Sequence, residues 1–437
     1  MRQLERLDPN LALAAAAVAI VATEAAYRTW ISDAWLLLEA LIAGVALFHA
    51  WREQDRLRLA PVLAVVGGLQ LALFGVHLAL DVVGDKDSSV VFRWQGNGLV
   101  RGDYPRSEYP LGAVLLFGLE AWLGGGSTRS ANALLMAPLA VVTSAAVWLT
   151  RAPYAPWLAA LIGFWPANAF YWQYKFDLAP AALLLVGLLL ALRGRWGLAG
   201  VALAVGTLVK WTPAFAAVAL VAWLLSTRRV REAAAHTAAF AVTIALAYVP
   251  FLVWSPSEVF AAYERQSGRS ITPESVWYLL LRPFDLAHVR THISFSAGAP
   301  RWANIAATLT QVLLVLLMIA AASRARSVRA AVALAALAPG VFLLSNRIFS
   351  PQFILVLFAG WAFAAALVAR STREQLAIGI AMAVAAVGNM FVYPYALPRY
   401  TATWPLSSAV LFSVGFGLTF WLARRAASAA APENAST

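Results

Sequence analysis

Continuous hydrophobic runs recur along the whole chain and alternate with short polar segments. Most runs reach roughly 17–25 residues, the length that a helix needs to cross a hydrocarbon core about 30 Å thick. The pattern predicts an all-α, polytopic transmembrane bundle of about 13–14 membrane helices. The predicted spans are residues 11–27, 33–50, 60–83, 131–150, 154–172, 178–192, 197–211, 212–226, 234–254, 302–322, 328–344, 353–369, 374–393 and 404–422.

One further apolar run, residues 111–123, is too short to span comfortably, because about 13 residues make a helix of only about 20 Å. We expect it to form a re-entrant or tilted half-helix. Residues 1–423 are expected to form a single transmembrane domain, and residues 424–437 a disordered cytoplasmic tail. Residues 85–110 form the first extracytoplasmic loop of this arrangement, and residues 255–301 form a long one.

The charges support a membrane location. Hydrophobic residues make up 62% of the 437 positions and charged residues only 12%, and the mean hydropathy is +0.72. The net charge is +12, and arginines gather in short connections between runs. Such clusters are typical of cytoplasmic loops, where anionic lipid headgroups are a sufficient partner. We therefore expect a multi-pass protein of a prokaryotic plasma (inner) membrane, with membrane lipids and no nucleic acid as partners.

The polar interval 85–110 is the first candidate for chemistry, because it carries Asp85, Asp87, Asp103 and Glu108 between long apolar runs. With the amino terminus inside, it falls on the outer side, provided that 111–123 does not fully cross. The same side then receives other polar elements, which include Lys175 and Asp177 in YWQYKFD, Lys210 in VKWTP, Arg269 to Ser275 in RSITPES, and Asn346 to Gln352 in NRIFSPQ.

Two lysines, Lys175 and Lys210, lie at the membrane edge, where an unpaired charge is costly. Either they reach to the interface with their flexible stems, or they belong to a charged site shared with the acidic loop. A metal site is not expected. His288 and His292 have i, i+4 spacing, but no nearby acid or cysteine completes a ligand set.

Five motifs occur in an order that resembles the GT-C membrane glycosyltransferases, and more narrowly the polyprenyl-phosphate-mannose-dependent α-mannosyltransferases. The motifs are an acid followed by Gly98-Leu99-Val100, Tyr104 and Glu108-Tyr109-Pro110; KFD with Asp177; VKWTP with Lys210 and Pro213; RSITPESVW with Arg269, Glu274 and Ser275; and FSPQF at residues 349–353. The chain departs from the family pattern at Leu111, where a second proline is usual, and in two additional helices at its start.

The resemblance implies transfer of a hexosyl group, with mannosyl as the first candidate, from a polyprenyl-phosphate sugar to a hydroxyl of a glycolipid or glycan. A single carboxylate base suffices for inversion, and cations can stabilise the leaving phosphate without a metal, so no cofactor is expected. Asp87 or Asp85 fits the base, with Glu108 as a further catalytic carboxylate. The expected substrate-binding residues are Tyr104, Tyr109, Lys175, Asp177, Lys210, Trp211, Arg269, Glu274, Ser275, Arg347 and Gln352.

Two other functions remain open. The same charges could serve a transporter or flippase of a lipid-linked sugar, although a transporter usually holds its ions near the membrane midplane. A polymerase or ligase of lipid-linked glycans would share the groove and differ mainly in donor length. The sequence selects neither the sugar nor the acceptor.

Overall fold

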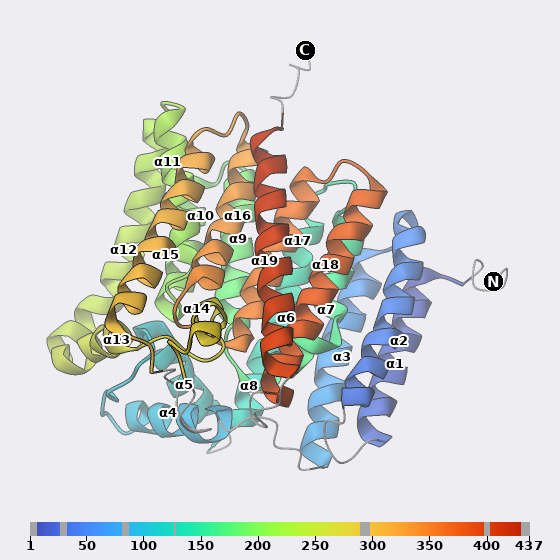
Figure 1. Ribbon diagram of the computed structural model, residues 1–437, viewed down its shortest axis with the longest axis horizontal. Coiled ribbons are helices and arrows are strands. Elements are labelled where there is room, and N and C mark those ends of the chain that lie inside the picture. The colour runs from blue at the N-terminus through green and yellow to red at the C-terminus, as the bar shows by residue number, and fades with distance from the viewer. Residues whose placement is uncertain are drawn as a thin grey trace.

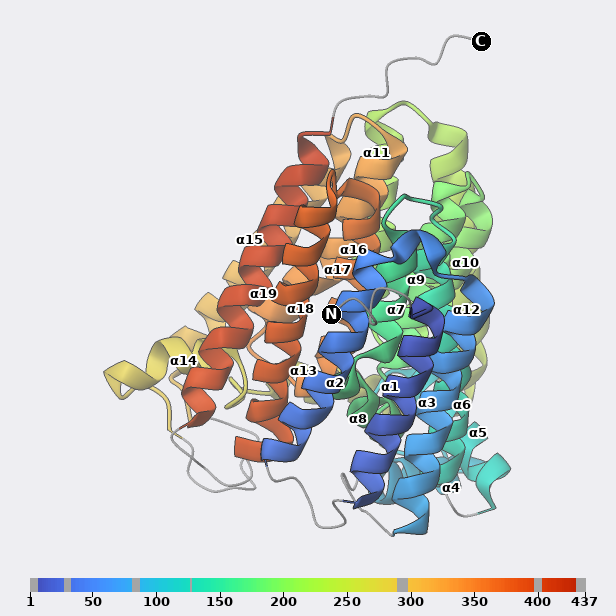
Figure 2. The same ribbon diagram turned by 90° about the vertical axis from the view of Figure 1, so that its right-hand side faces the viewer.

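Helices that run mostly along one common direction pack into one bundle in the computed structural model (Figures 1 and 2). The structure describes residues 7–26, 33–80, 87–125, 128–288, 298–396 and 403–429. Every regular element in these ranges is a helix. Nine of the described helices are long and apolar enough to cross a membrane. The predicted polytopic helical class is therefore confirmed.

Most predicted spans coincide with helices. The helices of 18 or more residues are α1 (Pro9–Ala26), α2 (Asp33–Arg52), α3 (Leu59–Ala79), α6 (Thr128–Trp148), α12 (Val230–Trp254), α15 (Arg301–Ser323), α16 (Val328–Ser345), α18 (Thr372–Met390) and α19 (Thr403–Ala427). Helix α17 (Ile354–Val368) reaches 18 residues together with the helical turn Pro351–Phe353 that precedes it. Shorter apolar helices are α9 (Leu178–Leu192), α10 (Trp196–Val209) and α11 (Pro213–Ser226). With 14 or 15 residues each, these three are only about 21–22 Å long. Their full crossing stays a prediction.

The predicted span 154–172 is wrong as a single helix. It consists of α7 (Ala155–Phe164) and α8 (Pro166–Tyr174), which meet at Trp165. Pro166 cannot donate a backbone hydrogen bond, and its ring pushes the preceding residue out of the helical region. Trp165 accordingly has extended backbone angles, with φ −72° and ψ 119°. The break separates α8 from α7, and Lys175 directly follows the last residue of α8.

Residues 87–110 are mainly helical, contrary to the expected loop. A short π-helical turn (Asp87–Val91) leads into α4 (Phe92–Val100), and α5 (Leu111–Gly124) follows. Phe92 is buried and stacks on Phe117 of α5 at a ring-centroid distance of 4.2 Å. At Gly96 the two helices touch so closely that a Cβ would lie 2.1 Å from the Phe117 carbonyl oxygen. Burial of this apolar face explains why the segment folds into a helix.

The long connection 255–301 also contains helices, namely α13 (Pro256–Gly268) and α14 (Val276–Leu281). At the other end of the chain, α19 continues to Ala427, past the expected start of a disordered tail. Arg425 lies within this helix and pairs with Glu374 of α18. Residues 430–437 of the expected tail lie outside the described residues.

The arginine clusters gather at one end of the bundle, the upper end in Figure 1. We call it the basic end; its clusters are residues 52–58, 193–195, 228–231, 324–329, 370–373 and 424–425. Contacts join them: Trp51 donates to the Thr372 carbonyl, and Trp223 donates to the Ala325 carbonyl. Helices α4, α5, α13 and α14 and the carboxyl end of α8 lie at the opposite end. The sequence-based separation of the charged segments into two sides is therefore present in the fold.

Candidate active site

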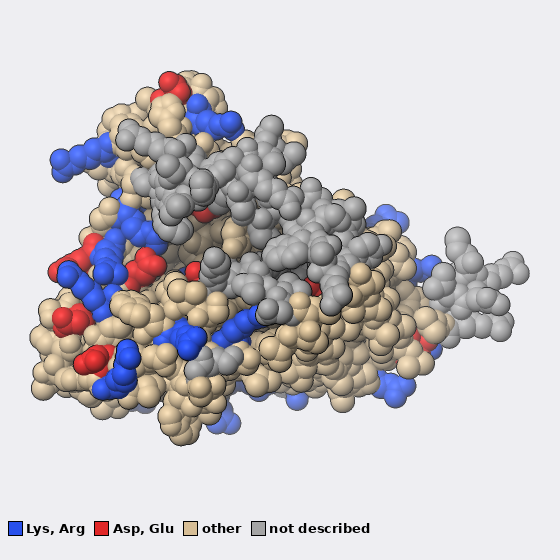
Figure 3. Space-filling model, turned by 90° about the horizontal axis from the view of Figure 1, so that it is seen from below, with Lys and Arg blue, Asp and Glu red and all other residues tan. Residues whose placement is uncertain are grey.

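A cavity of about 1130 Å³ lies at the end of the bundle opposite the basic end. Seen from that end, acidic and basic side chains crowd together on one part of the surface (Figure 3). The cavity walls come from α13, α15 and α16 and from the turns that follow α8, α10 and α16. The lining contains most of the residues expected at the site: Asp87, Glu108, Tyr109, Lys175, Lys210, Trp211, Arg269, Glu274, Arg347 and Gln352.

Lys210 lies in the turn between α10 and α11, where Pro213 begins the next helix and an extended backbone ends the first. Its ammonium group forms an ion pair with Asp177, which is fully buried just before α9. The ring of Phe353 lies 4.0 Å from the ammonium nitrogen. Lys210 is only 18% exposed. It is therefore bound inside the protein, and the interpretation as a lysine that reaches to the interface is wrong.

Lys175 follows the last residue of α8 and pairs with Asp87 at the start of the π-helical turn. The lysine is 7% exposed, whereas the aspartate is 35% exposed and lines the cavity. The interface interpretation therefore fails for this lysine too. The pair leaves one carboxylate at the cavity surface with a fixed cationic neighbour. Asp85, the alternative base, lies outside the described residues.

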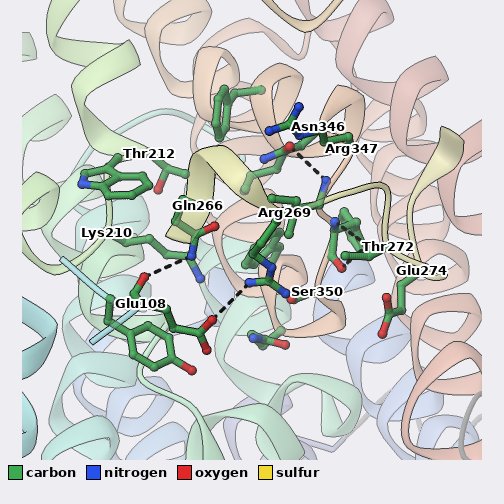
Figure 4. Close-up of a pocket in the computed structure, with 18 of the residues that line it drawn as sticks. Glu108, Lys210, Thr212, Gln266, Arg269, Thr272, Glu274, Asn346, Arg347 and Ser350 are labelled. Atoms are coloured by element: carbon green, nitrogen blue, oxygen red, sulfur yellow. Dashed lines mark hydrogen bonds and ion pairs between the residues drawn. The ribbon is translucent and has the colours of Figure 1, made fainter. Parts of the chain in front are cut away.

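Arg269 and Glu108 form a third, more exposed ion pair at the cavity, at 3.6 Å (Figure 4). Beside it, the side-chain amide of Gln266 on α13 donates to the Glu108 carbonyl at 3.0 Å. These contacts tie α13 and the segment after it to Glu108-Tyr109-Pro110. Gln266 and Arg269 of the long connection thus pack against the first polar segment.

Arg347 lies on another wall of the cavity, next to Asn346 (Figure 4). Its guanidinium donates to the Thr308 hydroxyl at 3.2 Å and to the Ser267 carbonyl at 2.9 Å. Within the described ranges it forms no ion pair, unlike Lys175, Lys210 and Arg269. Arg347 is therefore a cavity cation whose charge is not neutralised by any carboxylate of the described segments.

Two further ionisable groups face the cavity from loop segments. Burial raises the pKa of Glu274 to about 7, although its own backbone and Thr272 act in the opposite direction. Burial also raises the pKa of Tyr109 well above its ordinary value, and the carboxylates of Asp87 and Glu108 add to this effect. Near neutral pH, Tyr109 keeps its proton, whereas Glu274 changes its charge.

Three expected site residues have structural positions instead. Tyr104 packs against Phe251 and Trp254, at centroid distances of 5.7 Å and 6.4 Å, and does not line the cavity. Ser275 is buried as the N-cap of α14, where it accepts a hydrogen bond from the Tyr278 amide. Asp177 lies beneath the lining as the partner of Lys210. Their side chains serve packing, capping and charge pairing.

Other lining residues were missed, notably Thr212, Tyr263, Gln266, Thr308 and Gln311. Gln311 had a usable signal, because it is a polar residue inside the apolar run of α15. Tyr263 had none, since its position depends on how α13 folds across the end. Its ring stacks on Trp211 at 5.2 Å, so one face of the indole is already covered.

In the part of the chain that the structure describes, no group of three or more His, Cys, Asp or Glu side chains could hold a metal ion. His288 lies 3.4 Å from Asp285, and neither residue lines the cavity. His292 lies outside the described residues. The cavity therefore offers carboxylates and fixed cations as its chemical groups.

Comparison with known proteins identifies the family. A model of glycosyltransferase family 87 matches residues 108–351, from the glutamate of the EYP motif to the proline of SPQ. The match covers more than half of the chain. A comparison with curated proteins finds no significant match. The matched range contains most of the cavity lining. The chain therefore belongs to glycosyltransferase family 87, a GT-C-type family of membrane glycosyltransferases.

Proposed function

We propose that this membrane glycosyltransferase moves a hexosyl group, with mannosyl as the first candidate, from a polyprenyl-phosphate sugar to a hydroxyl of a lipid-linked or glycan acceptor, with inversion. One observation carries the proposal. The cavity combines a partly exposed carboxylate, Asp87, with Arg347, a guanidinium that forms no ion pair with the described carboxylates. Such a site can remove a proton from an attacking hydroxyl and bind a departing phosphate.

Asp87 is the proposed base. Its carboxylate reaches the cavity while Lys175 holds it in place, so an acceptor hydroxyl beside it can pass its proton to the carboxylate. Inversion needs only this one base on the face opposite the leaving group. Glu108 supplies a second carboxylate, which Arg269 orients. Asp85 stays the alternative base.

Arg347 and Arg269 are the proposed contacts of the donor phosphate. The phosphate gains charge as the anomeric bond breaks, and guanidinium groups stabilise that charge through directed hydrogen bonds. Arg347 forms no ion pair with a described carboxylate that phosphate binding would break. Arg269, in contrast, would have to bind the phosphate while it is paired with Glu108. Lys210 is proposed to stabilise the floor of the cavity, that is, the turn after α10, through its ion pair with Asp177. Its contribution to phosphate binding is proposed to be smaller than that of the two arginines. No metal or other cofactor is assigned to this reaction.

The membrane orientation follows from the two ends of the bundle. The arginine clusters of the basic end favour the cytoplasmic side and its anionic lipids. The cavity would then open toward the extracytoplasmic side of a prokaryotic plasma membrane. A polyprenyl-phosphate sugar could reach it there from the outer leaflet.

Purified protein in detergent tests this proposal, because detergent leaves no second compartment for transport. The protein is incubated with radiolabelled polyprenyl-phosphate mannose and a panel of glycolipid and glycan acceptors, and the product's anomeric configuration is determined. We expect a mannosylated product with inverted configuration. Failure to transfer any hexosyl donor, together with movement of lipid-linked sugar across proteoliposomes, would overturn the proposal in favour of the flippase alternative.

A further inference from the structure

Away from the cavity lining, polar side chains from three apolar helices meet in the interior of the bundle. His77 of α3 contacts Tyr174 of α8 through Nδ1, at 2.9 Å from the hydroxyl oxygen. Its Nε2 contacts the Glu24 carboxylate of α1. The three side chains are at most 9% exposed. Unpaired polar groups are costly in a membrane interior, so a connected set of this kind requires an explanation.

Arg129 at the start of α6 extends the set. Its guanidinium lies 3.4 Å from the Tyr174 hydroxyl and 5.4 Å from the centre of the tyrosine ring. Because a guanidinium only donates, the Tyr174 oxygen accepts from Arg129. Contacts with Arg129 and with His77 therefore hold the tyrosine hydroxyl from two sides, and His77 is in turn held by Glu24.

A neighbouring side chain fixes the same helix end. The buried amide of Asn132 on α6 donates to the carbonyls of Gln173 and Lys175, at 3.0 Å and 3.3 Å. These carbonyls belong to the last turn of α8 and to the residue that follows it, where helical hydrogen bonds run out. Side chains from α3 and α6 therefore converge on the carboxyl end of α8, and Glu24 of α1 is linked to it through His77.

That helix end carries the cation of the proposed base. Lys175 directly follows Tyr174, and its ammonium pairs with Asp87. The lysine has little freedom of its own, since it is 7% exposed and its amide is bound to the Tyr171 carbonyl at 2.9 Å. A shift of Tyr174 would therefore move Lys175 and, through the ion pair, the carboxylate of Asp87.

We propose that Glu24, His77 and Tyr174 are positioning residues of the transfer reaction, which hold Lys175 so that Asp87 keeps its place at the cavity. The inference rests on the proposed role of Asp87. It also gives a function to the first part of the chain, because Glu24 and His77 precede the range matched by the family model. The additional amino-terminal helix α1 would thus serve catalysis and not only packing.

The alternative is a purely structural role, in which the set stabilises the bundle without affecting the base. The two roles differ in kinetics. Loss of positioning lowers kcat and leaves the donor KM nearly unchanged, because a misplaced base affects the reaction step. Loss of stability lowers the amount of folded enzyme, and the folded fraction keeps its kcat.

Tyr174→Phe provides the mildest test, because it removes one oxygen and keeps the ring. We expect kcat per folded enzyme to fall about 10- to 100-fold for Tyr174→Phe and for Glu24→Leu. Glu24→Gln keeps an acceptor for His77 and should recover most of the rate. Thr143→Val is the matched control, since Thr143 is a buried residue of α6 that donates only within its own helix. Its kcat should equal that of the wild type.

A double-mutant cycle separates positioning from stability. In a Lys175→Met background the network has no cation to position, so adding Tyr174→Phe should cause no further loss of kcat. Equal losses in both backgrounds, or wild-type kcat in Tyr174→Phe and Glu24→Leu, would overturn the proposal.

Hydrogen exchange measured by mass spectrometry gives a second readout that needs no substrate. The peptide that contains residues 171–178 should exchange faster in Tyr174→Phe and Glu24→Leu than in Glu24→Gln or Thr143→Val. Unchanged exchange in this peptide would also overturn the proposal, even if no donor were turned over. If the wild type transfers no sugar but exchange changes as expected, the proposed reaction fails and the positional coupling stands.

Discussion

Lys210 and Asp177 form a buried ion pair beneath the cavity, with the aspartate fully enclosed and the lysine 18% exposed. The pair joins the turn after α10 to the start of α9. Because the aspartate is fully buried and the lysine mostly so, removing either partner would leave the other charge uncompensated in the interior. The position of Lys210 in VKWTP suggested a contact with substrate. Its ion pair with Asp177 shows that the lysine stabilises the cavity floor.

Lys210→Met should therefore destabilise the fold more than it weakens donor binding. It leaves a buried carboxylate without its cation, a change that costs about 3–5 kcal/mol. We expect a clearly lower thermal unfolding midpoint in detergent, measured by tryptophan fluorescence. The double variant Lys210→Met with Asp177→Leu removes both charges and should recover part of the loss. An unchanged midpoint in Lys210→Met would show that the pair does not support the floor.

Much of the architecture could be predicted from the sequence, because run length alone determines where an apolar helix can lie in a membrane. Several residues of the site could be predicted from the sequence for a related reason. Lys175, Lys210 and Arg347 each follow the end of an apolar helix, and an even number of crossings between them brings those ends to one side. Their lining of one cavity follows from this arrangement.

The sequence did not predict which side chains pair or how each helix is rotated about its axis. Glu24 and His77 lie in separate apolar helices, and their contact depends on helix rotations that no local sequence pattern records. Tyr104 and Ser275 occupy motif positions, yet their roles depend on the packing of α12 and on the start of α14. Helix α4 was missed because its apolar face is short and is buried only by packing against α5.

Asp87→Asn should abolish most of the activity while the protein still folds. The amide keeps the shape of the side chain but cannot take a proton, so turnover should fall by about 10²- to 10⁴-fold. Initial rates of sugar transfer at saturating donor measure the effect. Asp103→Asn is the matched control, because Asp103 is an exposed carboxylate of the same segment outside the cavity lining. Near-wild-type transfer by Asp87→Asn would return attention to Asp85.

Arg347→Met should weaken donor binding and slow transfer. A hydrogen bond to a charged group contributes about 1.5–3 kcal/mol, which corresponds to roughly a 10- to 150-fold loss. The quantity to measure is kcat/KM for the polyprenyl-phosphate sugar at sub-saturating donor. Arg265→Met removes an exposed arginine of α13 that does not line the cavity, and it should leave kcat/KM unchanged. Similar effects of the two substitutions would assign the loss to general surface charge.

Glu274→Gln should alter how stability depends on pH. Burial raises the pKa of Glu274 from an ordinary value of 4.5 to about 7, so the folded protein keeps a proton that the unfolded chain releases. This contribution to stability is fully present below pH 4.5 and is lost as the pH rises through about 7. Thermal midpoints recorded from pH 4.5 to 8 should therefore decline less in Glu274→Gln than in the wild type. Parallel curves would mean that Glu274 does not titrate in this range.

Ser267→Cys tests which side of the membrane the cavity faces. The chain contains no cysteine, so an introduced thiol gives an unambiguous signal. Ser267 is exposed on α13 beside the cavity, and Ser428 is exposed just after α19 at the basic end. Because arginine clusters favour the cytoplasm, an impermeant thiol reagent should label Ser267→Cys in intact cells and Ser428→Cys only after lysis. The reverse pattern would place the cavity in the cytoplasm, where the donor would have to be available on the inner leaflet.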